Sequence, residues 1–212
     1  MTKLMFFMLL VIYSIATSLE KPFQKQQSFS QLLNNNLKFS TSHITEIKIL
    51  SKGQSPTTLI LTCSDSRVST DLITEANLGD LFIHRNIANV FNDNDDSIKS
   101  VLYFATRELN ITKIVVIGHT GCAGVKHALE MNAGKHKDQP LLKPLNKYVG
   151  SIVDLIADKK DKTITNARID ALSMENVKSN VANIHNSPYI KVGVKVEGYI
   201  YHLTNGTLNK VI

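Results

Sequence analysis

Short apolar runs alternate with polar turns along the chain from residue 57 onward. Three runs rich in β-branched and aliphatic residues predict buried parallel strands over 57–62, 81–84 and 114–117. The stretch 190–203 also predicts a strand, because valines alternate there with polar residues and glycine. Asn205-Gly206 then predicts a tight turn into a last strand over 207–211.

Apolar positions three and four residues apart predict helices between these strands. Such a spacing joins Ile98 to Leu109 behind the possible caps Asp95 and Asp96, and further helices are expected over 145–156 and 174–184. Residues 19–50 are polar with short apolar clusters and predict N-terminal helices. The pattern indicates an α/β fold: a mainly parallel β-sheet flanked by helices, with N-terminal helices and a C-terminal antiparallel hairpin edge.

The first 18 residues differ from the rest of the chain. Lys3 precedes an apolar run over 4–13, and Ala16-Thr17-Ser18 offers small residues for a signal peptidase. The run is shorter than the roughly 20 apolar residues that cross a bilayer, so a cleaved signal peptide over 1–18 is favoured over a stable membrane anchor. We therefore expect an exported protein, periplasmic or secreted, whose mature part is one domain over 19–212.

Composition supports a single globular domain and argues against nucleic acid as a partner. The chain has 212 residues, of which 43% are hydrophobic and 20% are charged. Its net charge of +6 comes from basic residues dispersed along the sequence, with no run longer than Lys159-Lys160. A basic groove for nucleic acid is therefore not indicated.

Polar clusters follow three of the predicted strands, at residues 63–67, 85–86 and 118–122. In parallel sheets, ligands bind at the carboxyl ends of the strands. If the chain turns from strand into helix over 118–124, the three-residue step from His119 to Cys122 brings both side chains to one side. With Cys63 from the neighbouring strand they make a Cys₂His set, the ligand count of a catalytic zinc with an open fourth position.

A disulfide is the main alternative to this metal site. Cys63 and Cys122 are the two cysteines of the chain, and in an oxidising compartment two cysteines usually pair. Asp65 and Arg67, directly after Cys63, favour the metal, because a carboxylate beside a guanidinium is typical of the surroundings of a metal site. An ordinary surface ion pair remains possible for these two residues.

Several motifs in order resemble the β-class carbonic anhydrases. They are Thr62–Val68, Gly79–Asn89, Gly118–Gly124, Glu175–Val177 and Val196–Tyr201. The resemblance implies an enzyme that holds Zn²⁺ through Cys63, His119 and Cys122, uses Asp65 and Arg67 as a catalytic dyad, and interconverts CO₂ and bicarbonate. It also implies a homodimer or homotetramer in which the N-terminal helices embrace the partner subunit.

Two positions depart from the family pattern. Members usually have glycine in place of Ala123 and an apolar residue in place of His84. His84 could act as a proton shuttle, although a packed or solvent-facing ring is the better interpretation. The remaining histidines have no ligand-like spacing, and we assign them no role: His43, His127, His136, His185 and His202.

The ligand charges predict how the chemistry depends on pH. Two thiolates and a neutral imidazole cancel the charge of Zn²⁺, so its bound water should ionise at higher pH than water on a zinc with three histidines, and activity should rise at alkaline pH. Asp65, held by Arg67, is expected to accept a hydrogen bond from the zinc-bound hydroxide. In an inhibited form of the family the aspartate becomes the fourth ligand, and the sequence does not decide this point.

Two other functions are compatible with the same residues. Hydrolases of carbon disulfide or carbonyl sulfide resemble this family and share its zinc ligands. A non-catalytic exported protein, zinc-binding or stapled by a disulfide, would also keep both cysteines, but it would not need Asp65 and Arg67 beside an open metal position.

Overall fold

The structure is a computed structural model, and it describes residues 26–212. The predicted signal peptide over 1–18 lies outside these residues. The described chain divides into two compact units, one ending at Ile49 and the other spanning Leu50–Ile212.

The first unit is helical, as the sequence predicts. Helix α2 (Phe29–Ser42) begins at a capping box in which the Ser28 side chain accepts a hydrogen bond from the backbone N–H of Gln31, while the Gln31 side chain accepts one from the N–H of Ser28. Helix α3 (Ile44–Leu50) follows directly after His43. Neither helix buries any of its residues.

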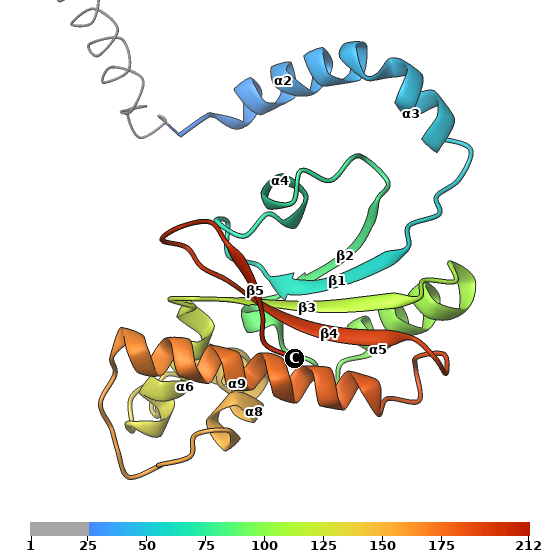
Figure 1. The fold of residues 1–212 in the computed structure, drawn as a ribbon. Helices are drawn as coiled ribbons and strands as arrows, with labels where there is room; N and C mark the ends of the chain where they lie inside the picture. Colours follow the sequence, from blue (N-terminus) through green and yellow to red (C-terminus); the bar gives the residue numbers. More distant parts are fainter. Residues whose placement is uncertain (1–25) are drawn as a thin grey trace, which may run out of the picture. The chain divides into compact units, whose positions relative to one another are not determined.

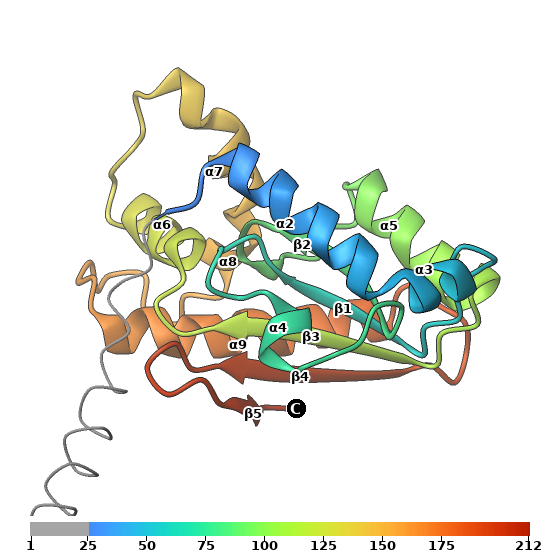
Figure 2. The ribbon, with the colours of Figure 1, turned by 90° about the horizontal axis from the view of Figure 1, so that it is seen from above.

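The second unit is built on a five-stranded sheet within the described residues, in the order β2-β1-β3-β4-β5. The strands are β1 (Thr58–Cys63), β2 (Leu81–Asn86), β3 (Lys113–His119), β4 (Lys195–Tyr201) and β5 (Leu208–Lys210). The first four run parallel, and β5 pairs antiparallel with β4 (Figure 2). The predicted α/β fold, with its antiparallel C-terminal edge, is confirmed.

The register brings the polar strand ends together. Cys63 pairs with Asn86 on one side, and Thr62 pairs with Ile117 on the other. The carboxyl ends of β1, β2 and β3 therefore meet at one edge of the sheet. Strands β1 and β3 are apolar and buried, so this edge is held by the hydrophobic core, whereas β2 is only partly buried.

Helix α9 (Asn166–His185), the longest within residues 26–212, lies along one face of the sheet against β3 and β4 (Figure 1). Its N-terminus is capped by Thr165, whose hydroxyl accepts from the N–H of Arg168. Helix α5 (Asp96–Tyr103) is capped by Asp95, as expected, and continues into a π-helical turn over Phe104–Glu108. The 3₁₀ turn η1 (Ile87–Asn89) contacts β1 and β3, and helix α6 (Ala123–Asn132) contacts η1, so both lie near this edge. The short helix α4 (Thr70–Ile73) follows β1 in the chain.

Two predicted elements are wrong in their bounds. The single helix expected over 145–156 is two helices, α7 (Lys143–Tyr148) and α8 (Gly150–Asp154), preceded by a 3₁₀ turn, η3 (Pro140–Leu142). The break falls at Val149, whose ψ of 6° leaves helical geometry and whose side chain is fully buried. The strand expected from residue 190 begins only at Lys195, because Gly193 adopts a positive φ in a turn before it.

Within residues 26–212, no helix is both long enough and apolar enough to span a membrane.

Candidate metal centre

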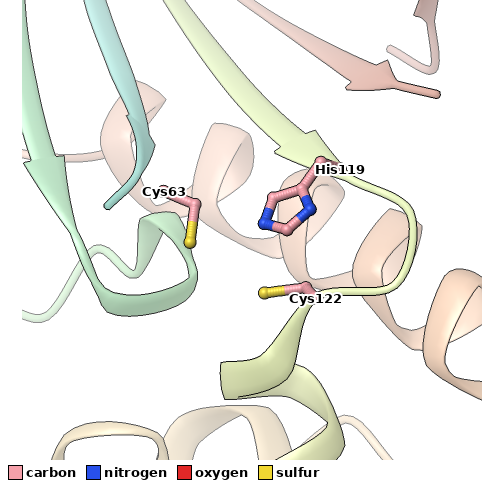
Figure 3. Close-up of side chains that lie close together, drawn as sticks. All are labelled: Cys63, His119 and Cys122. Carbon is pink, nitrogen blue, oxygen red and sulfur yellow. The ribbon is translucent and has the colours of Figure 1, made fainter. Parts of the chain in front are cut away.

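Cys63, His119 and Cys122 converge at the carboxyl edge of the sheet. Cys63 ends β1, His119 ends β3, and Cys122 is the N-cap of α6. All three are buried, and one ligand atom from each lies within 4.8 Å of the other two. Figure 3 shows both sulfur atoms and one edge of the imidazole facing the same space. The predicted convergence is confirmed, with His119 placed at the end of a strand and not in a helical turn.

The loop between His119 and Cys122 is fixed by hydrogen bonds from distant elements. Gly121 has a φ of +62°, and its backbone N–H donates to Asp170 Oδ1 of α9 at 2.7 Å. The hydroxyl of Thr120 accepts from the N–H of Leu203 at 3.1 Å. Nothing in the local sequence pointed to Asp170, because its partner lies 49 residues away.

The imidazole of His119 is prepared to act as a ligand. Its Nδ1 lies 2.9 Å from the carbonyl oxygen of Thr120, and a carbonyl only accepts, so Nδ1 carries the proton. Nε2 then has a free lone pair, and it is buried without a hydrogen-bond partner among residues 26–212. A metal-binding histidine is held in this way, with its second nitrogen bonded to a carbonyl.

The two cysteines are buried free thiols, and their pKa values are shifted in opposite directions. The Cys122 side chain, the His119 ring and the backbone N–H groups of Asp65 and Ala88 together lower the pKa of Cys63 despite its burial. The Cys63 thiolate, together with burial, raises the pKa of Cys122. Burial disfavours a charged His119 ring, but the Cys63 thiolate, the Thr120 carbonyl and the Asp65 carboxylate together raise the pKa of His119.

This donor set fits a divalent cation. A cation bound by the two sulfurs and His119 Nε2 would replace the thiol protons of Cys63 and Cys122, and it would occupy the lone pair of Nε2. Sulfur and imidazole nitrogen are the ligands that zinc prefers. The Cys63 sulfur and burial raise the pKa of Cys122 in the absence of a cation, and the backbone N–H groups of Val125 and Gly124, at the start of α6, only partly oppose this rise.

Asp65 and Arg67 form a bidentate pair beside this cluster. Arg67 Nε donates to Asp65 Oδ1 at 2.9 Å, and Arg67 Nη2 donates to Oδ2 at 2.7 Å. The pair holds the pKa of Asp65 well below its usual range. Asp65 Oδ2 lies 3.9 Å from His119 Nε2, and the carboxylate side chain is 13% exposed. An ionised acceptor therefore stands next to the cysteine and histidine side chains.

Arg85 is a functional residue that the sequence interpretation did not assign. Its Nε donates to the carbonyl oxygen of Cys63 at 3.2 Å, and its Nη2 donates to that of Asp65 at 2.8 Å. It thereby fixes the backbone that carries both Cys63 and the Asp65 carboxylate. The polar cluster at 85–86 was the available signal, since it ends the strand next to β1.

A second group of possible ligands, His127, Glu130 and His136, is better explained by hydrogen bonding. The two imidazoles are stacked, with ring centres 4.6 Å apart and planes 16° from parallel. Ring lone pairs in nearly parallel stacked planes do not meet at one ion. His127 Nε2 is bonded to Asn146 Oδ1 at 2.7 Å, and His136 Nε2 to Glu130 Oε2 at 3.1 Å.

His84 agrees with the interpretation of a packed ring. It is half-buried in β2, and burial lowers its pKa, so the ring is neutral near pH 7. Its Nε2 has no hydrogen-bond partner in the described part of the chain.

Comparison with known proteins places the chain in a family. A family model described as carbonic anhydrase matches residues 58–208. The fold also matches a solved tetrameric β-carbonic anhydrase of Sordaria macrospora, with a TM-score of 0.73 and 25% identity over 86% of this chain and 94% of that one. The chain belongs to the β-class carbonic anhydrase family. The resemblance read from the motifs around Cys63 and His119 is thus confirmed.

Curated relatives named carbonic anhydrase support the same assignment. One from Candida albicans is 32% identical over 88% of this chain and 69% of its own length. One from Synechococcus elongatus is 29% identical over 80% of this chain. The match spans 65% of the length of that cyanobacterial relative.

Proposed function

We propose that this chain is a carbonic anhydrase, which interconverts CO₂ and bicarbonate at a zinc ion held by Cys63, His119 and Cys122. One observation carries the proposal: two sulfurs and a lone imidazole nitrogen converge beside a carboxylate that an arginine holds in place. Membership of the family supports it. Bound zinc would supply the acidity that turns water into a nucleophile.

Asp65 is proposed to orient the attacking water. Its pKa is well below the usual range, so Oδ2 is an acceptor at the pH of the reaction and can take a hydrogen bond from that water. Arg67 occupies both carboxylate oxygens, which keeps Asp65 from turning inward as a fourth ligand. The observed pair therefore favours the open arrangement of the site over the inhibited one.

A homodimer or homotetramer is proposed as the working assembly. Helix α2 buries none of its residues, although it carries Phe29, Leu32, Leu33 and Leu37. An amphipathic helix with an uncovered apolar stripe is suited to cover a partner. The related Sordaria macrospora enzyme is described as tetrameric.

Export to the periplasm or outside the cell is proposed from the sequence alone. The proposal depends on the charged start, apolar run and small residues within 1–18. Sequencing the N-terminus of the secreted protein would test it.

The test of the function is a stopped-flow assay of CO₂ hydration on the purified protein, run beside an assay for sulfide release from carbon disulfide and carbonyl sulfide. We expect CO₂ hydration that requires bound zinc and rises from about pH 7 to about pH 9, because two thiolates reduce the acidity of the metal. Sulfide release without CO₂ hydration would indicate a hydrolase on the same scaffold. Thiols that titrate only after reduction would indicate the disulfide.

A further inference from the structure

Two asparagines on α9 form hydrogen bonds with the backbone of one short turn and the residues just after it. Asn176 and Asn180 are spaced i, i+4, so they lie on the same face of the helix, and they are 2% and 3% exposed. Burying an amide is unfavourable unless its donors and acceptor are bonded. The hydrogen-bond partners of these amides therefore indicate which segment of the chain the two asparagines stabilise.

The partners lie on the turn η1 and the residues just after it. Asn176 Nδ2 donates to the carbonyl oxygen of Ala88 at 2.8 Å, and Asn180 Nδ2 donates to that of Asn89 at 3.1 Å. Asn180 Oδ1 accepts from the N–H of Phe91 at 3.0 Å. Asn180 Nδ2 also bonds Asn176 Oδ1 at 3.1 Å, which joins the two amides into one network.

The turn they hold is in an unfavourable conformation. Ala88 and Asn89 have φ values of 59° and 49°, in the left-handed region. This region is costly for alanine, and such residues persist only where the surrounding structure fixes them. Hydrogen bonds from α9 to both carbonyls supply that restraint.

The same turn packs against both cysteine-bearing segments. Ala88 lies in one buried cluster with Cys63 and Cys122. It also faces the start of α6 so closely that a Cβ added at Gly124 would lie 2.9 Å from the Ala88 side chain. In addition, the turn η1 contacts β1, the strand that ends at Cys63.

We propose that Asn176 and Asn180 are positioning residues of the metal centre, which hold the Ile87–Asn89 turn in its left-handed conformation and so fix the backbone that faces Cys63 and α6. The proposal rests on the function proposed above, because it concerns the same ligands. Residues that orient the ligands of a metal from outside typically change its affinity by about 10-fold to 100-fold when they are removed.

The test compares Asn176→Ala and Asn180→Ala with a matched control, Ser173→Ala. Ser173 is buried on the same helix, but its hydroxyl bonds only the Ile169 carbonyl of its own helix, so its loss perturbs packing without touching the turn. The measurements are zinc affinity, by competition with a chelator, and the thiolate-to-metal charge-transfer band of the full-length protein loaded with Co²⁺.

We expect each asparagine variant to bind zinc about 10-fold more weakly and to shift the charge-transfer band, and Ser173→Ala to change neither. If Asn176→Ala does not fold, Asn180→Ala carries the same expectation. Adding Ala88→Gly to either asparagine variant should restore part of the lost zinc affinity, because glycine adopts the left-handed conformation without the hydrogen bonds from α9.

Asparagine variants that match Ser173→Ala in affinity and spectrum would overturn the inference, as would an absence of any recovery with Ala88→Gly. A wild-type protein without a thiolate band would instead contradict the proposed metal site itself, so the two failures are distinguishable.

Discussion

At the scale of single residues, the proposed chemistry depends on the pairing of Asp65 with Arg67. The carboxylate is bound at both oxygens by one guanidinium, and it stands 3.9 Å from the free nitrogen of His119. The arrangement supplies an ionised acceptor close to the proposed ligands, and it supports the proposal that Asp65 is not one of them. Arg67 is mostly exposed, so its contribution is to orientation and not to packing.

Removing the Asp65 carboxylate should separate chemistry from metal binding. In Asp65→Ala we expect zinc to stay bound and the rate of CO₂ hydration to fall by about 100-fold or more, because the attacking water loses its orientation. Stopped-flow kinetics and metal analysis on the same sample measure both quantities. Asp71→Ala, which removes an exposed carboxylate on α4, is the control and should leave the rate unchanged. A near-normal rate in Asp65→Ala would show that the assigned role is wrong.

Removing a ligand should abolish metal binding. Cys63→Ser and His119→Ala are expected to lose zinc and to unfold at lower temperature, because binding of the metal contributes to the stability of the fold. His127→Ala serves as the matched control, since this ring belongs to the stacked pair with His136 and should not affect metal content. The measurement is the zinc content of each variant after dialysis. Loss of zinc in His127→Ala but not in His119→Ala would contradict the assignment.

At the scale of elements, the close contact between α9 and the sheet depends on two glycines. A Cβ added at Gly118 of β3 would lie 2.6 Å from Val177, and one added at Gly198 of β4 would lie 2.6 Å from Val177 and 3.1 Å from Val181. The helix can approach these strands only where they have no side chain. Its polar residues then reach the turn and the loop that support the metal centre.

Filling this contact should destabilise the fold. Gly198→Ala is expected to lower the free energy of unfolding by about 1–3 kcal/mol, because the added methyl group overpacks a buried contact. Urea denaturation measures the change. Gly150→Ala is the control, since a Cβ there meets nothing within 4 Å and φ is not positive. Equal stability of both variants would mean that α9 can move away from the sheet without cost.

The strands and the side chains that converge at their ends were predictable because their signals are local. Apolar β-branched runs that end in polar clusters mark the buried parallel strands, and Cys63 and His119 follow directly from two of them. The break at Val149 was not predictable, since the apolar spacing continues across it and tertiary packing overrides the helical pattern.

The supporting residues of the site were not predictable either. Asp170 bonds Gly121 across 49 residues, and Asn176 bonds Ala88 across 88 residues. One sequence carries no sign of which distant backbone groups a buried amide or carboxylate will meet. The left-handed conformation of Ala88 is likewise set by these contacts and not by alanine itself.

At the scale of the whole molecule, assembly through α2 is the main expectation beyond the single chain. In Leu33→Asp/Leu37→Asp, two charges replace exposed apolar side chains of α2, and we expect a dimer or tetramer to become a monomer. Light scattering after size exclusion measures the mass. Asn34→Asp/Asn36→Asp adds the same charge to the same helix and should leave the assembly intact. A wild-type monomer would contradict the expectation outright.

The most direct test of the account is X-ray absorption at the zinc edge of the purified protein. The account predicts about one zinc per chain with two sulfur ligands near 2.3 Å and one imidazole nitrogen near 2.0–2.1 Å, plus a light atom in the fourth position. A first shell without sulfur, or a protein that takes up no zinc while its cysteines are joined as a disulfide, would contradict it.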